Sequence, residues 1–149
     1  MSLEQIKQTK GRVLGVDFGE ARTGLAISDA ARLLASGIGN IAGGGLEKTA
    51  DAIVSAASEQ NAVGVVLGLP VNMNGTEGPR AERVHRLAEL IAARAPELPV
   101  ALMDVRMTTM AASRFLNETN TRGKKRKGVI DTLSAQIILQ NALDRLKQS

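Results

Sequence analysis

The sequence predicts an α/β domain built on a five-stranded mixed sheet with helices on both faces. Two observations predict it. The first two strand-like segments are joined by a short turn, whereas the later ones are separated by segments with helical periodicity. Residues 62–69 are almost unbroken apolar, which is typical of a strand buried on both faces. The length of 149 residues fits one such domain.

The strands are predicted from short apolar runs that end at turn-forming residues. Residues 18–22 read as a tight connection, so the two strands that flank them should form a hairpin. We expect strands at residues 12–17, 23–28, 34–41, 62–69 and 100–103.

The helices are predicted where apolar residues recur every three to four positions. Pro79 lies near the start of the second helix, where proline is tolerated. We expect helices at about residues 46–57, 79–91, 108–116 and 130–146, with a polar, basic and mobile stretch at 117–128. Residues 1–10 are expected to be a flexible N-terminal tail, and residues 11–149 a single domain.

The composition indicates a globular and cytoplasmic protein. Hydrophobic residues make up 44% of the chain, yet no apolar run approaches the length of a membrane span. The N-terminus lacks the apolar stretch of a signal peptide. The absence of cysteine excludes disulfides and thiolate metal sites.

The charge distribution favours nucleic acid as the partner. The net charge is +4, and basic residues crowd into one short stretch, namely Arg122, Lys124, Lys125, Arg126 and Lys127. Phe18 and Phe115 are the only aromatic residues, which argues against binding by base stacking. Contacts to phosphate should therefore dominate, although a run of charge is more often only a solvated face.

Three carboxylates are predicted to lie where α/β folds place their chemistry. Asp17 ends the first strand, Asp104 ends the last strand, and Asp131 opens the last helix. Carboxylates gathered there repel one another unless a cation such as Mg²⁺ or Mn²⁺ lies between them. Two such ions can activate water and stabilise the leaving oxygen of a phosphodiester.

Each of these residues also has an ordinary structural interpretation. Asp17 could simply form a turn, and Asp131 could only favour the positive end of its helix. Asp104 alone favours neither interpretation. Asn72 lies in a loop after a buried strand, where substrate contact and turn formation are equal alternatives.

Four motifs in order along the chain carry a family resemblance. They are residues 16–19 with 22–24 (VDFG and RTG), residues 68–75 (GLPVNMNG), residues 104–109 (DVRMTT), and residues 130–131 (ID) with Ala135. Together they resemble the bacterial YqgF/RuvX family, the pre-16S rRNA nucleases also described as Holliday-junction-resolvase-like.

The resemblance implies a ribonuclease-H-like fold, a cytoplasmic location and metal-dependent hydrolysis of phosphodiester bonds. It also implies that Asp17 corresponds to the family's first catalytic aspartate and Asp131 to the one on the final helix. Arg22, Asn72 and Arg106 would correspond to motif positions near the site, where they could contact nucleic acid.

This chain departs from the family pattern at Val105. The family has Asp-Glu-Arg where this sequence has Asp104-Val105-Arg106, and valine can neither ligate metal nor act as an acid or base. Asn74 is a smaller departure, because the family often has aspartate there. Either Asp104 substitutes for the glutamate or the metal site is weakened. Neighbours on a strand point to opposite faces, which favours the second alternative unless the strand end relaxes that rule.

Three functions remain open at this point. The first is a nuclease that uses Asp17, Asp131 and Asp104 to hold Mg²⁺ or Mn²⁺ and acts on pre-16S rRNA or Holliday junctions. The second is a weakened or inactive nucleic-acid-binding protein of the same fold. The third is an ATPase of the actin and sugar-kinase type, which is usually built from two such domains. A homodimer would suit a symmetric junction.

Overall fold

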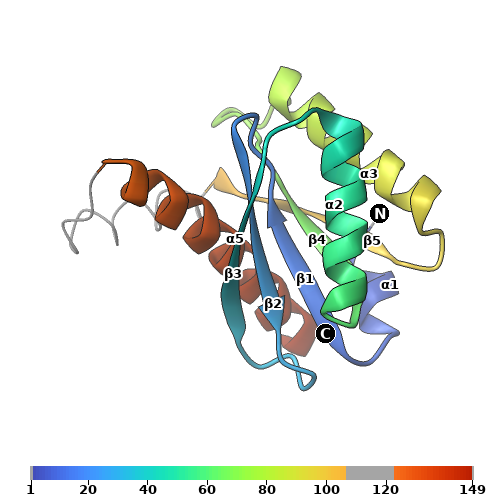
Figure 1. Cartoon of the computed structure of the whole chain (residues 1–149). Helices are drawn as coiled ribbons and strands as arrows, with labels where there is room; N and C mark the ends of the chain where they lie inside the picture. The colour runs from blue at the N-terminus through green and yellow to red at the C-terminus, as the bar shows by residue number, and fades with distance from the viewer. Residues whose placement is uncertain (1, 107–122, 149) are drawn as a thin grey trace.

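The fold is a three-layer α/β arrangement in which helices cover both faces of one sheet (Figure 1). The computed structural model describes residues 2–106 and 123–148, and the side chains of residues 123–131 and 148 lie outside that description. The predicted helix at 108–116 and the predicted mobile stretch up to residue 122 also lie outside it. The described helix bounds are α1 Leu3–Lys7, α2 Leu46–Glu59, α3 Pro79–Arg94 and α5 Gly123–Gln148.

The sheet has five strands, as the sequence predicts, and the structure orders them β3-β2-β1-β4-β5. Their bounds are β1 Arg12–Asp17, β2 Arg22–Ser28, β3 Ala35–Ala42, β4 Ala62–Leu69 and β5 Val100–Asp104. The first three strands form an antiparallel meander, whereas β4 and β5 run parallel to β1. A mixed sheet results because α2 and α3 supply the crossovers that parallel strands need.

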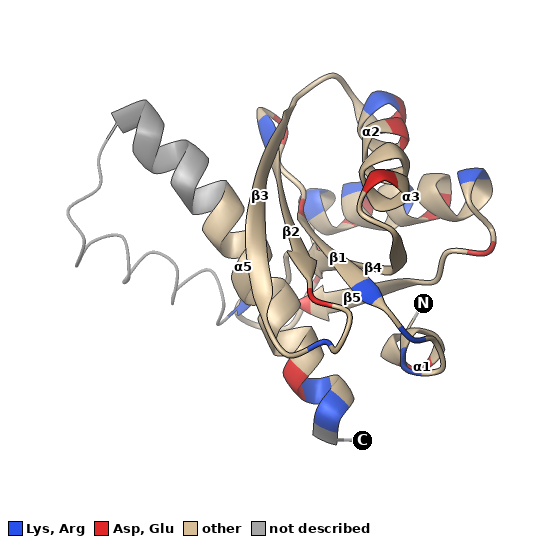
Figure 2. Ribbon diagram, turned by 60° about the horizontal axis from the view of Figure 1, so that its bottom comes forward, with Lys and Arg blue, Asp and Glu red and all other residues tan. Residues whose placement is uncertain are grey.

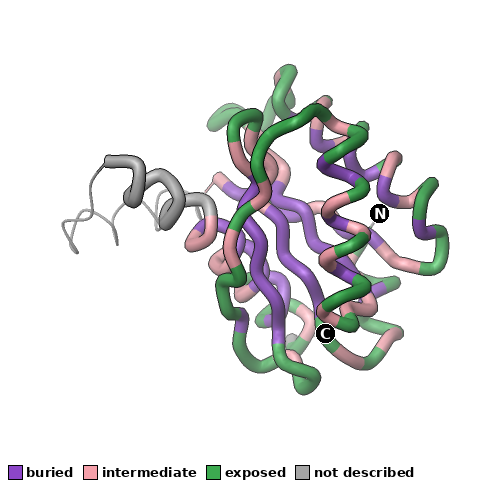
Figure 3. The backbone as a smooth tube through the Cα atoms, viewed as in Figure 1, coloured by how far each residue is buried: buried purple, intermediate pink, exposed green. Residues whose placement is uncertain are grey.

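Two apolar clusters, one on each face, hold the layers together. Alternate residues of the strands face α2 and α3, where Leu14, Val16 and Leu67 lie fully buried. The intervening residues face α5, where Val13 and Val66 pack against Leu139 and its neighbours. Figure 3 shows the resulting pattern, with buried strands at the centre and exposed outer helix faces.

The N-terminal residues depart from the expectation of a flexible tail. Leu3–Lys7 forms α1, and Ile6 is fully buried in the cluster on the α5 face. The guanidinium of Arg32 donates hydrogen bonds to the carbonyls of Gly11 and Ile6, at 2.7 and 3.0 Å. The expectation of a flexible tail is therefore wrong for α1. Leu3 and Ile6 alone, in a polar stretch, give too little periodicity to predict a helix.

The last helix is also longer than the sequence predicts. We expect it from about residue 130, but α5 begins at Gly123 and includes the basic run at 124–127. The apolar face starts only near residue 130, so periodicity does not reveal the polar first turns. The described part of the chain contains no helix long and apolar enough to cross a membrane.

Candidate nuclease site

Asp17 lies at the carboxyl end of the central strand and on the face that α5 covers. It is the last residue of β1, pairs with Gly24 of β2 and is half-buried. Val13 belongs to the cluster on the α5 face, and residues two apart on a strand share a face. Asp17 is therefore directed toward the α5 layer, at the edge of the sheet where open α/β folds bind ligands.

The helix that carries Asp131 crosses this same face at close range. A Cβ added at Gly15 would lie 2.6 Å from Cβ of Leu139 and 3.1 Å from the carbonyl oxygen of Ala135. Glycine at this position therefore lets α5 approach β1 closely. Asp131 lies in α5 one turn before Ala135, while Asp17 lies two residues beyond Gly15. The backbone thus brings the two aspartate positions to one side of the sheet; the side chain of Asp131 is outside the described residues.

Val105, which stands where the family pattern has glutamate, lies on this same face. Its side chain is 9% exposed and packs in the α5-side cluster with Met103. A Cβ added at Gly68 would lie 2.7 Å from Cγ1 of Val105 and 2.6 Å from Cδ1 of Ile138. The β1–β4 register pairs Val16 with Leu67. One residue further along both strands, Gly68 lies beside Asp17. An apolar side chain therefore fills the space next to the Asp17 position.

Asp104 makes a different set of contacts from the one that the metal hypothesis requires. Met103 and Val105 on either side of it pack toward α5, so strand alternation turns Asp104 away from that cluster. Its carboxylate accepts hydrogen bonds from the backbone N–H of Arg106 at 3.0 Å and from the Arg106 guanidinium, with Nη2–Oδ2 at 2.7 Å. These hydrogen bonds from Arg106, side chain first and backbone second, hold the pKa of Asp104 below its ordinary value.

The remaining predicted residues are spread around the same end of the sheet. Arg22 begins β2, and alternation with Ala26 places it on the α5 face, the face of Asp17. The side-chain amide of Asn72 donates to Oγ1 of Thr76 at 3.0 Å, within the loop that follows β4. The basic side chains at 124–127 lie in the first turns of α5 but outside the description. Figure 2 shows charged residues along the helices and at the ends of the strands.

A hard cation beside Asp17 would have to take most of its ligands from water or substrate. Among the described side chains, no three histidine, cysteine, aspartate or glutamate residues gather closely enough to hold a metal ion. Mg²⁺ commonly keeps several waters and uses only one or two protein carboxylates together with substrate phosphates. Such a site needs fewer carboxylates than the three that the sequence predicts, and Val105 can supply none.

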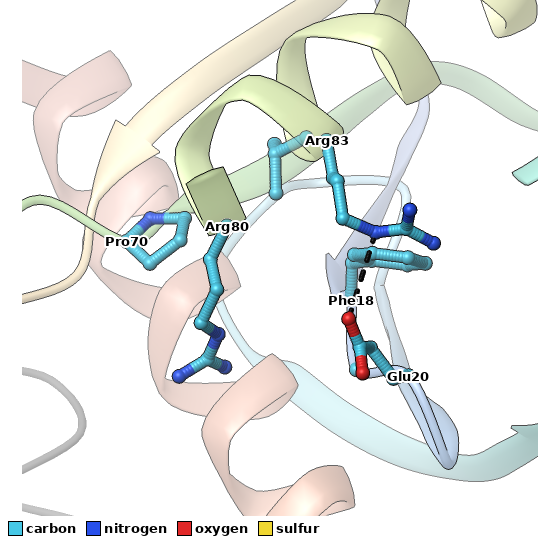
Figure 4. Close-up of a pocket in the computed structure, with 7 residues that line it drawn as sticks. Phe18, Glu20, Pro70, Arg80 and Arg83 are labelled. Atoms are coloured by element: carbon cyan, nitrogen blue, oxygen red, sulfur yellow. Dashed lines mark ion pairs between the residues drawn. The ribbon is translucent and has the colours of Figure 1, made fainter. Parts of the chain in front are cut away.

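One pocket at this end of the sheet was not predicted from the sequence. We call it the arginine pocket; it is lined by Phe18, Gly19, Glu20, Pro70, Arg80, Arg83 and Val84 (Figure 4). Arginines three residues apart next to the helix-starting Pro79 were the available signal, because residues at that spacing lie on one side of a helix. Nothing in the sequence reveals that Phe18 lies beneath Arg83.

Comparison with known proteins shows the family to which the chain belongs. A family model described as "RuvX: Holliday junction resolvase" matches residues 11–145. The chain belongs to the RuvX family. The matched residues span the whole sheet and most of α5. The predicted enzyme class, a nuclease that hydrolyses nucleic acid, is confirmed.

Two relatives of this RuvX chain carry the name "Putative pre-16S rRNA nuclease". The protein from Rhodopseudomonas palustris strain BisB5 is 43% identical over 137 residues, which cover 92% of this chain and 85% of the relative. The protein from Ruminiclostridium cellulolyticum is 38% identical over 136 residues, which cover 91% of this chain and 95% of the relative.

Solved structures confirm the predicted ribonuclease-H-like fold of this RuvX chain. Thermus thermophilus RuvC in complex with a Holliday junction substrate superposes with a TM-score of 0.55 at 14% identity, covering 91% of this chain and 95% of that one. The fowlpox virus Holliday junction resolvase gives a TM-score of 0.52 at 11% identity, with coverages of 93% and 99%. At such low identity these likenesses concern the fold alone.

Proposed function

We propose that this RuvX chain is a metal-dependent nuclease that processes the 5′ end of pre-16S rRNA in the cytoplasm. The observation that carries the proposal is the position of Asp17, at the carboxyl end of β1 and on the face crossed by the helix of Asp131. The choice of RNA rests on the relatives at 38–43% identity, whose names specify that substrate. Holliday junction resolution, named in the family description, is the alternative substrate.

Asp17 and Asp131 are the residues that would hold Mg²⁺ or Mn²⁺. Bound there, the metal would activate a water and neutralise charge on the phosphate that is cut. Arg22, on the same face as Asp17, and the basic run at 124–127 would hold the flanking phosphates. Asp104, paired with Arg106, would position that arginine near the site rather than ligate metal.

Substitution of Asp17 by asparagine tests the nuclease proposal. The amide keeps the size of the side chain but removes the charge that attracts a cation, so cleavage should fall by about 100-fold or more. The assay uses labelled precursor 16S RNA and, in parallel, a four-way DNA junction, each with Mg²⁺, Mn²⁺ or chelator. Circular dichroism should show an unchanged fold. Wild-type cleavage that persists in Asp17→Asn would contradict the assignment.

Burial of Val105 favours a second candidate, a protein that binds nucleic acid with little or no cleavage. Val105→Glu restores the family carboxylate, and we expect it to raise metal-dependent cleavage. A carboxylate in this buried position should also lower the free energy of unfolding by roughly 1–3 kcal/mol without metal. Val105→Gln is the matched control, since it has the same size without the charge. An inert wild type together with an active Val105→Glu would establish the second candidate.

A further inference from the structure

The arginine pocket lies at the same sheet end as the proposed metal site but on the opposite face. Phe18 directly follows Asp17 in the chain, and Pro70 directly follows β4. Phe18 packs against the cluster beneath α2 and α3, and Val84 belongs to that cluster. At the carboxyl edge of the sheet, Asp17 therefore lies on one face and the arginine pocket on the other. The peptide bond between Asp17 and Phe18 links the two.

The ring of Phe18 holds the guanidinium of Arg83 in place. The central carbon of that guanidinium lies 5.8 Å from the centroid of the ring, within range of a cation–π contact (Figure 4). Because Arg83 covers this ring face, a nucleobase could not stack there. The pocket therefore offers planar, forked N–H donors, which match the geometry of phosphate oxygens.

The positive charge of the pocket is only partly neutralised. Glu20 lies 3.8 Å from Nε of Arg83, beyond hydrogen-bond distance, and its own side chain is 76% exposed. Within the described residues, Nε of Arg83 is the one buried side-chain nitrogen or oxygen without a hydrogen-bond partner. A donor left in this state costs free energy that an incoming acceptor would recover.

Arg80 adds a second cation without a neighbouring carboxylate. It lies one turn before Arg83 in α3 and lines the same pocket. No carboxylate of the described residues lies within ion-pair distance of it. The positive end of α3, a helix of 16 residues, adds to the local potential at this point.

We propose that the arginine pocket binds a backbone phosphate of the nucleic-acid substrate, on the far side of the sheet edge from the bond that is cut. Arg83, whose plane Phe18 fixes, holds this phosphate, and Glu20 gives way when the strand binds. Arg80, whose guanidinium points to the other side of the pocket (Figure 4), holds the next phosphate along the strand. The inference rests on the proposed nuclease function and extends it by a second contact point, which sets the direction in which the strand crosses the edge.

The test measures binding separately from cleavage. Fluorescence anisotropy follows a labelled single-stranded RNA that spans the 5′ end of mature 16S rRNA, bound to the Asp17→Asn chain over a series of salt concentrations. In that background Arg83→Ala and Arg80→Ala should each weaken binding roughly five- to tenfold and lower the salt slope by about one. Arg83→Lys, which keeps the charge but loses the fork, should recover only part of the affinity.

Arg86→Ala is the matched control, because it removes the same charge from an exposed position on the same helix, outside the pocket. Glu20→Gln should tighten binding, since it removes the carboxylate that competes for Arg83. If Arg80→Ala and Arg83→Ala bind like Arg86→Ala, the phosphate site is overturned while the nuclease proposal stands. If the chain with wild-type arginines binds neither single-stranded nor duplex RNA or DNA, both proposals fail.

Discussion

At the scale of single residues, Val105 stands where the family pattern has glutamate, while Asp104 keeps the aspartate of that pattern. The side chain next to the Asp17 position is an apolar valine with 9% exposure, and the neighbouring carboxylate is bonded to Arg106. A change of one residue along a strand reverses the face of the side chain, so Asp104 cannot replace a missing glutamate by moving slightly. In the proposed nuclease, neither Asp104 nor Val105 would therefore serve as a metal ligand.

The Asp104–Arg106 pair makes a prediction about pH. The pKa of Asp104 is lowered in the folded protein, so its stabilising contribution is present above the ordinary value of 3.8. It is lost as the pH falls through the lowered value, and near neutral pH stability should not change. Carboxyl-carbon NMR should show a low pKa that rises toward 3.8 in Arg106→Gln. An Asp104 pKa that is equal in both proteins would contradict this role for Arg106.

At the scale of elements, the site depends on how closely α5 lies on the sheet. Gly15, Gly37 and Gly68 lie where a Cβ would meet side chains of α5, from Leu139, Thr132 and Ile138 respectively. These contacts extend from β3 to β4, so they fix where α5 crosses the sheet. Since Asp131 precedes Thr132, the same contacts position the backbone of the second aspartate relative to Asp17.

Gly15→Ala tests this coupling between packing and function. Its Cβ would lie 2.6 Å from Cβ of Leu139, so α5 must shift, which should cost about 1–3 kcal/mol in the free energy of unfolding. Cleavage should fall as well, because the shift moves Asp131 relative to Asp17. Urea denaturation and the RNA cleavage assay measure the two effects. Gly44→Ala, whose new Cβ meets only the Lys48 side chain, with Cδ nearest at 3.1 Å, is the control and should change neither.

At the scale of the whole molecule, the two apolar clusters stabilise the fold, and the proposed site lies at their rim. Both clusters consist of aliphatic and small side chains that cover the two faces of the sheet. The proposed metal ligands lie at the rim, where β1 ends and α5 passes. We therefore expect folding to need no metal, in contrast to small domains that fold around a structural ion.

Removal of metal should consequently abolish cleavage and leave the fold intact. In excess EDTA we expect no hydrolysis of the RNA substrate and an unchanged circular dichroism spectrum. The melting temperature should rise only slightly when Mg²⁺ is added, because weak binding at a rim site stabilises the native state by a small linkage free energy. A chain that unfolds cooperatively on chelation would show that the ion is structural.

The sequence alone determined the strands, the central helices and the order of the motifs. The apolar periodicity of a strand or helix depends only on residues close together in the chain. The bounds of β1 and β4 were predicted to the residue because their apolar runs end at turn-forming residues. The importance of Val105 was also readable, since the family motif shows which residue has been replaced.

Only the tertiary structure decided which side chains meet. The sequence did not predict α1, whose burial of Ile6 depends on strands far along the chain. It did not predict that Phe18 supports Arg83, because the two lie on different elements and meet only when α3 packs on the sheet. Periodicity is set by neighbours in the chain, whereas a binding site is set by contacts between distant segments, and those contacts exist only after the layers have packed.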